Sequence, residues 1–338
     1  MKKNVTNLLR LLAGIVTLSS IYYFAPWEAG LYYLRPLSHT LQQEVDLFVE
    51  QGVDGVIVYV DKKGEEPAYY SSGLDNRINQ TPIRPDALFK IASIAKLYDA
   101  AAITKLVGEG KVELDGYLSD YLPLISARIE HADAITIRML IQHRSGIPNY
   151  TDHARYHWGE LDVDIMDLVL DQPADFKPNT DYAYSNSNYL LIQKIITEVT
   201  GAPHGEYIQQ TLLAPLGLSH TFFSINDVSK DRVISGYHVG YEDDLRHLDH
   251  GYLSTAKDVS IFLRALNEGT FFSDKEKQIY TSLYEYDHTG WVLGYQSIAR
   301  YHEQEDMVVI QFVSTTGNDI VMLTNILYDR VMHILRAK

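Results

Sequence analysis

The sequence contains no cysteine. This absence excludes a disulfide, a thiol nucleophile and a cysteine-ligated zinc site, and it suits a chain exported to an oxidising exterior. Positive charge is also scarce, because 29 Lys and Arg against 44 Asp and Glu give a formal net charge of −15. Long-range attraction to nucleic acid is therefore not expected, and no nucleic-acid partner is predicted. The 338 residues, 46% of them hydrophobic, are enough for a large core in one or two domains.

The amino terminus carries a targeting pattern. Three basic residues lead into Leu11–Trp27, a stretch with no charge. A basic region before an apolar stretch is typical of a signal sequence, and the positive-inside bias places the rest of the chain outside the cell. A small-residue cleavage site is poorly represented and no cysteine is present to carry a lipid. We therefore expect an uncleaved signal anchor over residues 1–30, crossing the membrane through residues 8–27. An ordinary cleaved secretory signal is the alternative.

The remaining chain is expected to form a linker, residues 31–38, and a globular domain, residues 39–338. Turn signals and apolar periodicity divide that domain into elements. The expected helices are 39–51, 91–108, 254–268 and 328–336, and the expected strands are 53–60, 67–72, 291–301, 307–315 and 320–326. The middle, roughly 111–250, is mostly helix and loop. This order predicts an α+β fold in which both chain ends build one sheet around a helical insertion.

Ser93 and Lys96 form the first candidate catalytic motif. A serine hydroxyl must lose its proton to become a strong nucleophile, and residues three apart on a helix share one face. A partly desolvated lysine gives up its proton more readily, so Lys96 is suited to act as the base. The spacing alone is weak, because Ser254 and Lys257 repeat it. We favour Ser93, because the residues around it are apolar and small, as in a buried helix. We expect Ser254 to be a helix N-cap.

Tyr184 and Asn186 form the second motif, in a polar run over 179–188 that is expected to be loop. A tyrosine near an ammonium has its anionic form favoured, so Tyr184 is expected to shuttle a proton. Asn186 offers a donor and an acceptor for a substrate amide. Read alone, this motif is explained more simply by an asparagine-rich turn with the tyrosine packed on its neighbours.

His288, Thr289 and Gly290 precede an expected strand and form the third motif. A glycine there lets a ligand approach the backbone closely. The backbone N–H of Trp291 can then join that of Ser93 to hold an oxyanion. His288 is expected to give a substrate carboxylate either a hydrogen bond or, near pH 6, a positive charge.

Together these motifs, in this order, resemble the superfamily of penicillin-binding proteins and class C β-lactamase-like serine hydrolases. The resemblance covers residues 40–330 and includes several scaffold segments, which begin at Leu114, Ile135, Pro215 and Gly251. It implies an antiparallel sheet flanked by helices and an acyl-enzyme mechanism without metal or cofactor. The implied site consists of a nucleophile (Ser93), proton-transfer groups (Lys96 and Tyr184), substrate-binding groups (Asn186, His288, Thr289 and Gly290) and oxyanion N–H groups (Ser93 and Trp291).

Two departures bear on the substrate. The His-Thr-Gly form of the third motif resembles D-alanyl-D-alanine carboxypeptidases and D-alanyl esterases more than lactamases. Trp291 is bulky and argues against broad lactam hydrolysis, while a short segment between Tyr184 and His288 favours an open outer cleft. The implied substrate is D-alanine-bearing cell-wall material, either peptidoglycan stem peptide or D-alanylated teichoic acid. A penicillin-binding sensor or a β-lactamase-like protein with little turnover is the alternative.

Two further patterns have weaker functional interpretations. His153 with His157, and His247 with His250, have spacings that could seat a metal, but surface histidines explain them more simply. The 25 tyrosines could line a carbohydrate-binding face, although packed tyrosine is the simpler explanation. No metal site is predicted.

Overall fold

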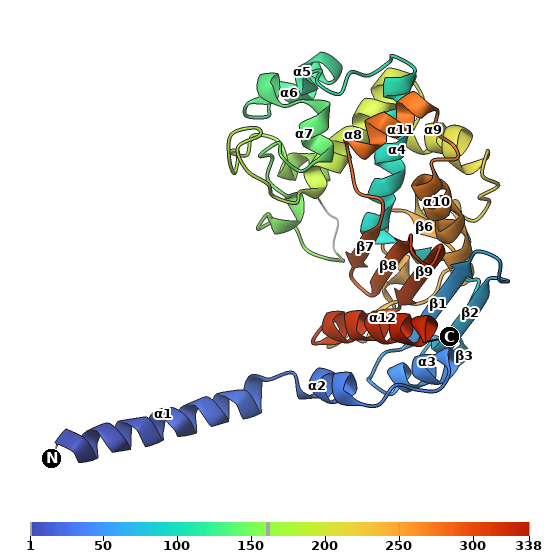
Figure 1. The fold of residues 1–338 in the computed structure, drawn as a ribbon. Helices are drawn as coiled ribbons and strands as arrows, with labels where there is room; N and C mark the ends of the chain where they lie inside the picture. Colours follow the sequence, from blue (N-terminus) through green and yellow to red (C-terminus); the bar gives the residue numbers. More distant parts are fainter. Residues whose placement is uncertain (1, 160–162, 250, 338) are drawn as a thin grey trace.

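The centre of the protein is an antiparallel sheet with the strand order β3-β2-β1-β9-β8-β7. The structure is a computed structural model that describes residues 2–159, 163–249 and 251–337. The strands come from both chain ends: β1 (Gly55–Lys62), β2 (Ala68–Asn76), β3 (Thr81–Pro82), β7 (His288–Val292), β8 (Tyr295–His302) and β9 (Met307–Val313). The predicted α+β fold, with one sheet built from both ends, is confirmed (Figure 1).

Strand β1 shows how the sheet separates two cores. Its side chains alternate between the two faces, as the twofold period of a strand requires. Val56 and Val58 join a cluster with the helices α3 (Leu41–Val49) and α12 (Ile320–Arg336). Ile57 and Tyr59 join the larger cluster on the other face, under the helical lobe. The sheet is therefore covered on both faces (Figure 1).

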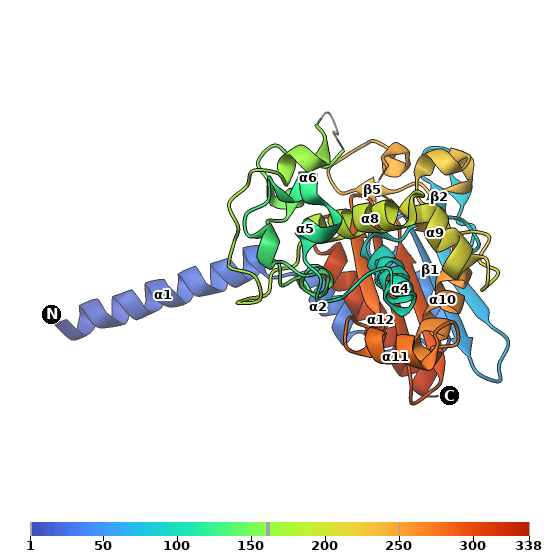
Figure 2. The same cartoon turned by 90° about the horizontal axis from the view of Figure 1, so that it is seen from above.

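The helical lobe lies over the second face of the sheet (Figure 2). Its helices are α4 (Ala95–Gly108), α5 (Leu118–Tyr121), α6 (Pro123–Ser126), α7 (Ile137–Ile141), α8 (Asn186–Thr200), α9 (His204–Ile208), α10 (Ala256–Glu268) and α11 (Asp274–Thr281). Short strands join it to the sheet layer: β4 (Phe89–Lys90) pairs with β6 (Leu253–Ser254), and β5 (Tyr237–His238) with β10 (Thr315–Thr316).

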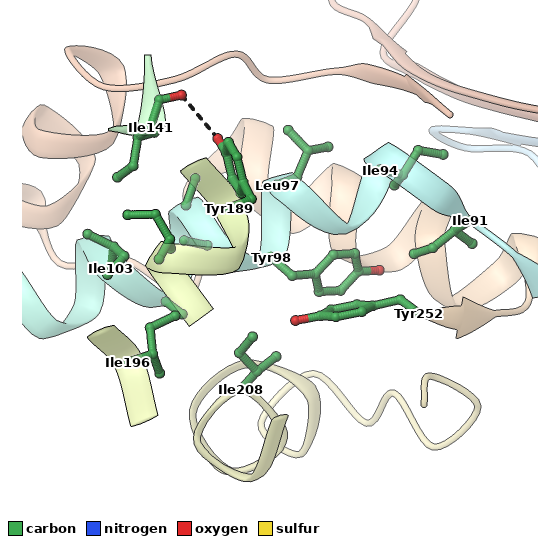
Figure 3. Close-up of a cluster of buried hydrophobic side chains, with 14 of the residues drawn as sticks. Ile91, Ile94, Leu97, Tyr98, Ile103, Ile141, Tyr189, Ile196, Ile208 and Tyr252 are labelled. Carbon is green, nitrogen blue, oxygen red and sulfur yellow. Dashed lines mark hydrogen bonds between the residues drawn. The ribbon is translucent and has the colours of Figure 1, made fainter. Parts of the chain in front are cut away.

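Helix α4 lies at the middle of the lobe. Its residues from Lys96 to Thr104 are all buried, so apolar groups surround the helix on every side. Figure 3 shows Leu97, Tyr98 and Ile103 of α4 packed among side chains from α8, α9 and the segment before β6. A helix buried all round is held rigidly by packing, and it fixes whatever its first turn carries.

Two expected elements near the carboxyl terminus are wrong. Residues 320–326 were expected to be a strand but belong to α12, because Ile320, Leu323 and Leu327 recur at helical spacing along its buried face. The single strand expected over 291–301 is two strands, β7 and β8, joined by a tight turn at Gly294, whose φ is +88°. Such a backbone angle suits glycine, which lacks a Cβ.

The amino-terminal helix α1 (Lys2–Phe24) extends away from the body (Figures 1 and 2). Asn4–Phe24 is long and apolar enough to cross a membrane, with a mean hydropathy of 1.4 and none of it buried. A signal sequence or an anchor fits this helix equally.

The segment expected as a linker is instead partly helical. Helix α2 (Trp27–Leu34) crosses the boundary drawn at residue 30, and its Ala29 and Tyr32 are buried in the core with α12. The Tyr32 hydroxyl donates to Glu44 at 2.8 Å, and the buried Arg330 donates to the carbonyls of Arg35 and Pro36. Residues 27–36 are therefore packed against the body.

Candidate functional site

Ser93 lies where the sheet layer meets the helical lobe. It sits in a single 3-10 turn, η1 (Ala92–Ile94), directly before α4, so the helix expected over 91–108 is present but begins as a tighter turn. Ala92 has φ +50°, which is unfavourable for a residue with a Cβ. Such strain persists only where the surroundings impose it and is frequent at functional sites.

The hydroxyl of Ser93 has two close partners. Lys96 Nζ lies 3.2 Å from Ser93 Oγ, and the Tyr184 hydroxyl donates to the same oxygen at 2.7 Å. The first and second motifs are therefore brought together, although 91 residues separate Ser93 from Tyr184. A serine oxygen that faces both a lysine nitrogen and a phenol has a route for its proton.

Lys96 is buried and holds its charge weakly. Its Nζ lies over the rings of Tyr184 and Tyr189, 4.9 and 5.2 Å from their centroids, and donates to Asn186 Oδ1 at 2.8 Å. Burial lowers the pKa of Lys96 from its ordinary value to about 7, and the negative charge of Asp99 opposes the shift. Near neutral pH both protonation states are populated, as a general base requires.

Tyr184 is a neutral phenol, not an anion. Burial raises the pKa of Tyr184 to about 12, although its hydrogen bond to Ser93 acts in the opposite direction. The expectation that the nearby ammonium favours the anion is therefore wrong, because desolvation has the largest effect on the pKa of this phenol. A neutral phenol donates a hydrogen bond, so Tyr184 is placed to stabilise negative charge on Ser93 Oγ.

Asn186 holds Lys96. Its Oδ1 accepts from Lys96, and both its Nδ2 and its backbone N–H donate to Asn149 Oδ1, at 3.2 and 3.0 Å. The run expected to be loop to residue 188 becomes helical at Asn186, the first residue of α8. Asn149 had no recognisable signal in the sequence.

Strand β7 runs beside η1, and Gly290 permits this approach. A Cβ at Gly290 would lie 2.4 Å from the Ile91 carbonyl and 2.3 Å from Ser297 Oγ. The glycine therefore admits the protein's own backbone, where a ligand had been expected. Trp291 follows it in the strand, and its ring packs edge-on against Trp158 at 5.2 Å.

His288 is neutral at physiological pH. Burial lowers the pKa of His288 to about 4, so the positive charge expected near pH 6 is absent. Its Nδ1 lies 2.5 Å from the Thr289 carbonyl and its Nε2 3.0 Å from the Tyr284 hydroxyl. Because only a ring N–H can donate to the carbonyl, Nδ1 carries the proton and Nε2 accepts from Tyr284.

The second Ser-x-x-Lys match does not form a site. Ser254 is fully buried in β6, where its hydroxyl is paired with that of Thr221 at 2.8 Å, while Lys257 is exposed. The expected N-cap role is also wrong, because Thr255 caps α10.

A cavity of about 620 Å³ opens over these groups. The predicted residues among its lining are Ser93, Lys96, Tyr184, Asn186, His288, Thr289 and Trp291. A second cavity of about 480 Å³ adjoins it and shares Tyr184 and His288. Among the described residues no cluster of His, Asp and Glu could hold a metal ion, and His250 lies outside them.

Residues 37–300 match the family model described as "Beta-lactamase". The chain belongs to the beta-lactamase family. It is therefore a serine hydrolase, as the motifs predicted. Penicillin-binding protein 4* of Bacillus subtilis is 27% identical to this hydrolase over 183 residues, which cover 52% of the chain and 39% of that protein. Protein flp of Staphylococcus aureus (strain N315) is 28% identical over 215 residues, 61% of the chain and 42% of that protein. The matched region spans about two fifths of these relatives.

Solved structures share the fold of this beta-lactamase-family hydrolase. A D-amino acid amidase from Ochrobactrum anthropi SV3 superimposes with a TM-score of 0.78 at 24% identity, over 88% of this chain and 97% of that one. A penicillin-binding protein from Bacillus halodurans superimposes with a TM-score of 0.72 at 21% identity, over 89% and 99%. At these identities the likeness shows the fold alone.

Proposed function

We propose that this hydrolase forms an acyl-enzyme on Ser93, with Lys96 as the general base and Tyr184 as a hydrogen-bond donor. The observation that carries the proposal is the contact of one serine oxygen with both a lysine nitrogen and a phenol, at 3.2 and 2.7 Å. The lowered pKa of Lys96 supports the base role, because a neutral amine has the lone pair that takes the proton.

The steps follow from these positions. Ser93 Oγ attacks the acyl carbonyl carbon while its proton passes to Lys96 Nζ. The bond to the leaving group then breaks, and the proton returns to the leaving atom through Tyr184. Water then takes the place of the leaving group and attacks the acyl carbonyl carbon. Its proton passes along the same route to Ser93 Oγ, and the bond to Ser93 breaks to release the acid. We propose that the backbone N–H groups of Ser93 and Trp291 hold the oxyanion, since β7 lies against η1.

The remaining motif residues are proposed to bind substrate. Thr289 and His288 line the cavity beside the nucleophile. Because His288 is neutral, its contribution is a hydrogen bond or a shape contact. Asn186 is already engaged with Lys96 and Asn149, so it orients the base and has one amide hydrogen left for a substrate.

We propose D-alanine-bearing cell-wall material as the substrate, either the D-alanyl ester of teichoic acid or a D-Ala-D-Ala stem peptide. The packed Trp158–Trp291 pair lines one wall of the cavity and reduces the space beside it, which suits a small acyl group. An alkoxide leaves more readily than an amine anion, so ester cleavage asks less of the leaving-group acid. We therefore favour D-alanyl esters over peptides and expect little β-lactam hydrolysis.

The location is proposed from α1. A free apolar helix preceded by basic residues fits a single-pass anchor with the catalytic domain outside the cell, or a cleaved signal with a secreted domain.

The test is to incubate the full chain, in detergent, with D-alanylated teichoic acid, a D-Ala-D-Ala peptide and a fluorescent penicillin, following adduct and product by mass. A D-alanyl adduct on Ser93 and a higher kcat/KM for the ester are expected. Peptide turnover well above ester turnover favours D-alanyl-D-alanine carboxypeptidase activity over esterase activity. An adduct that never turns over favours a sensor, and efficient lactam hydrolysis contradicts both cell-wall substrates.

A further inference from the structure

A buried carboxylate lies directly behind the site. Asp99 follows Lys96 by three residues on α4, so the two side chains share one helix face. Asp99 is only 1% exposed, yet it borders the same cavity as Ser93. None of the three sequence motifs includes it.

The carboxylate is held by two neutral donors. The Tyr252 hydroxyl donates to Asp99 Oδ1 at 2.7 Å, and Gln193 Nε2 donates to Asp99 Oδ2 at 3.0 Å. These partners come from α8 and from the segment before β6, so three separate parts of the chain converge here. Figure 3 shows Tyr252 beneath the start of α4, beside Tyr98.

His204, at the start of α9, completes the cluster. Its ring stacks on that of Tyr252 with 6.2 Å between centroids. Its Nε2 is buried and has no hydrogen-bond partner among the residues that the structure describes. Burial lowers the pKa of His204, so the ring is neutral at physiological pH and does not form an ion pair with Asp99.

Burial of this carboxylate is not explained by stability. A buried acid loses hydration, and two neutral donors return only part of that free energy. Burial raises the pKa of Asp99, which shows that the charged form is disfavoured there, while His204, the two donors and Lys96 act to keep it charged. Costly buried charges concentrate at functional sites, and the one cationic centre on the same helix face is the base.

We propose that Asp99 is a positioning residue: its buried carboxylate stabilises the ammonium that Lys96 becomes when it takes the proton of Ser93. The inference rests on the proposed function, in which Lys96 is the base. A negative charge behind the amine raises the pKa of Lys96, so the neutral amine accepts the serine proton more strongly. The same shift keeps the amine protonated, and therefore inactive as a base, up to a higher pH.

Besides Ser93 and Asn186, which contact Lys96 directly, the titratable and polar groups around this pair come from six parts of the chain. They are Tyr189 and Gln193 on α8, His204 on α9, Tyr252 before β6, Tyr184 and His143 from the lobe loops, and His288 on β7. The three histidines have lowered pKa values, through burial, and the tyrosines raised ones. Between pH 7 and 9 the charge of the pair is therefore set by Lys96 and Asp99 themselves.

The test compares Asp99→Asn with the wild type as full chains in detergent, using the burst of p-nitrophenolate from p-nitrophenyl acetate as the acylation rate. Asparagine keeps the shape and removes the charge. We expect the acidic limb of the pH–rate profile, where Lys96 loses its proton, to shift to lower pH by about 0.5 unit or more. The burst at pH 6 should then be about 3-fold faster than in the wild type, and the plateau at pH 9 should be slower. A purely structural role would scale the rate equally at every pH.

Glu109→Gln is the matched control, because Glu109 at the far end of α4 also accepts a tyrosine hydroxyl, that of Tyr207 at 3.1 Å. Its profile should match the wild type. A limb within 0.2 pH unit of wild type in Asp99→Asn overturns the proposal. If that variant does not fold, Tyr252→Phe removes a donor that favours the charged carboxylate and should move the limb in the same direction. An unmoved limb again overturns it.

Loss of the proposed function is a distinct result. A burst that persists in Ser93→Ala, or is absent from the wild type, contradicts the nucleophile before any question about Asp99 arises.

Discussion

The imidazole of His143 lies stacked on the ring of Tyr184, with 4.4 Å between centroids and 30° between planes. His143 Nδ1 accepts from the Ser185 backbone N–H at 3.1 Å, so His143 holds both the ring of Tyr184 and the backbone of the residue that follows it. Burial lowers the pKa of His143 to about 3, with the charge of Lys96 acting in the same direction. The histidine therefore positions Tyr184 without adding charge beside Lys96.

Removal of the Tyr184 hydroxyl should slow acylation. Tyr184→Phe keeps the stack on His143 but deletes the donor to Ser93 Oγ, and a positioned proton-transfer group is worth roughly 100- to 10,000-fold in rate. We expect at least a 100-fold loss in the burst rate with an unchanged melting temperature. Tyr182→Phe, two residues earlier and 57% exposed, is the control and should stay within about threefold. A comparable small loss in Tyr184→Phe would remove it from the proton route.

Substitution of the serine in each of the two Ser-x-x-Lys matches should have opposite effects on covalent labelling. Ser93→Ala should abolish covalent labelling and leave the fold intact, because the lost hydroxyl is not needed for packing. Ser254→Ala should retain labelling within a few-fold and lose about 1 kcal/mol of unfolding free energy, since it removes the buried hydrogen bond to Thr221. Peptide mass mapping after labelling decides the site. A label on Ser254 would contradict the assignment.

The sequence predicted which side chains lie together in the cavity better than it predicted the elements around them. Ser93 and Lys96 lie together because a helix places residues three apart on one face. A separate motif marked Tyr184, which the fold brings to the same serine oxygen. Two of the contacts that tune them are long-range: Asn149 and His143 have no local pattern that marks them as neighbours. Only the assembled lobe brings them to the site.

The errors in the elements have physical causes. The β-branched run that begins α12 favours a strand by local propensity, but its apolar residues recur at helical spacing over 17 residues, and packing against α3 decides the outcome. Charges were misjudged for the same reason. A nearby ammonium suggested an anionic Tyr184, and the ordinary pKa of histidine suggested a positive charge on His288 near pH 6. Burial, which the sequence does not specify, keeps both neutral.

His288 should act without titrating. Since burial lowers its pKa to about 4, its charge does not change between pH 5.5 and 8. His288→Ala should therefore reduce kcat/KM by a factor that is constant across this range and similar for D-Ala-D-Ala peptides and for neutral esters. The comparison is made on both substrate types at each pH. A loss that grows below pH 6.5, on carboxylate substrates only, would restore the charged role.

Lys90 should make stability rise with pH. It is 1% exposed and donates to the carbonyls of Leu245 and Leu248, and burial lowers its pKa to about 7. Between pH 7 and about 10 the unfolded chain binds a proton that the folded chain has lost, so the free energy of unfolding increases with pH. Urea titrations should show a shallower rise in Lys90→Met.

Lys257→Met, at an exposed position, is the control and should follow the wild-type slope. Equal slopes in Lys90→Met and the wild type would show that Lys90 does not titrate in this range.

The folded unit should begin before residue 30. A chain lacking residues 1–24 keeps α2, so it should be soluble and retain the full burst rate. A chain lacking residues 1–38 loses Tyr32 and the carbonyls that pair with Arg330, and it leaves the buried Arg330–Glu44 ion pair uncovered. A hydrogen bond to a charged group is worth about 1.5–3 kcal/mol, so this chain should melt lower or aggregate. Melting curves of both truncations decide the boundary: equal stability would place the start of the domain at residue 39, whereas a loss confined to the longer deletion makes α2 part of the hydrolase.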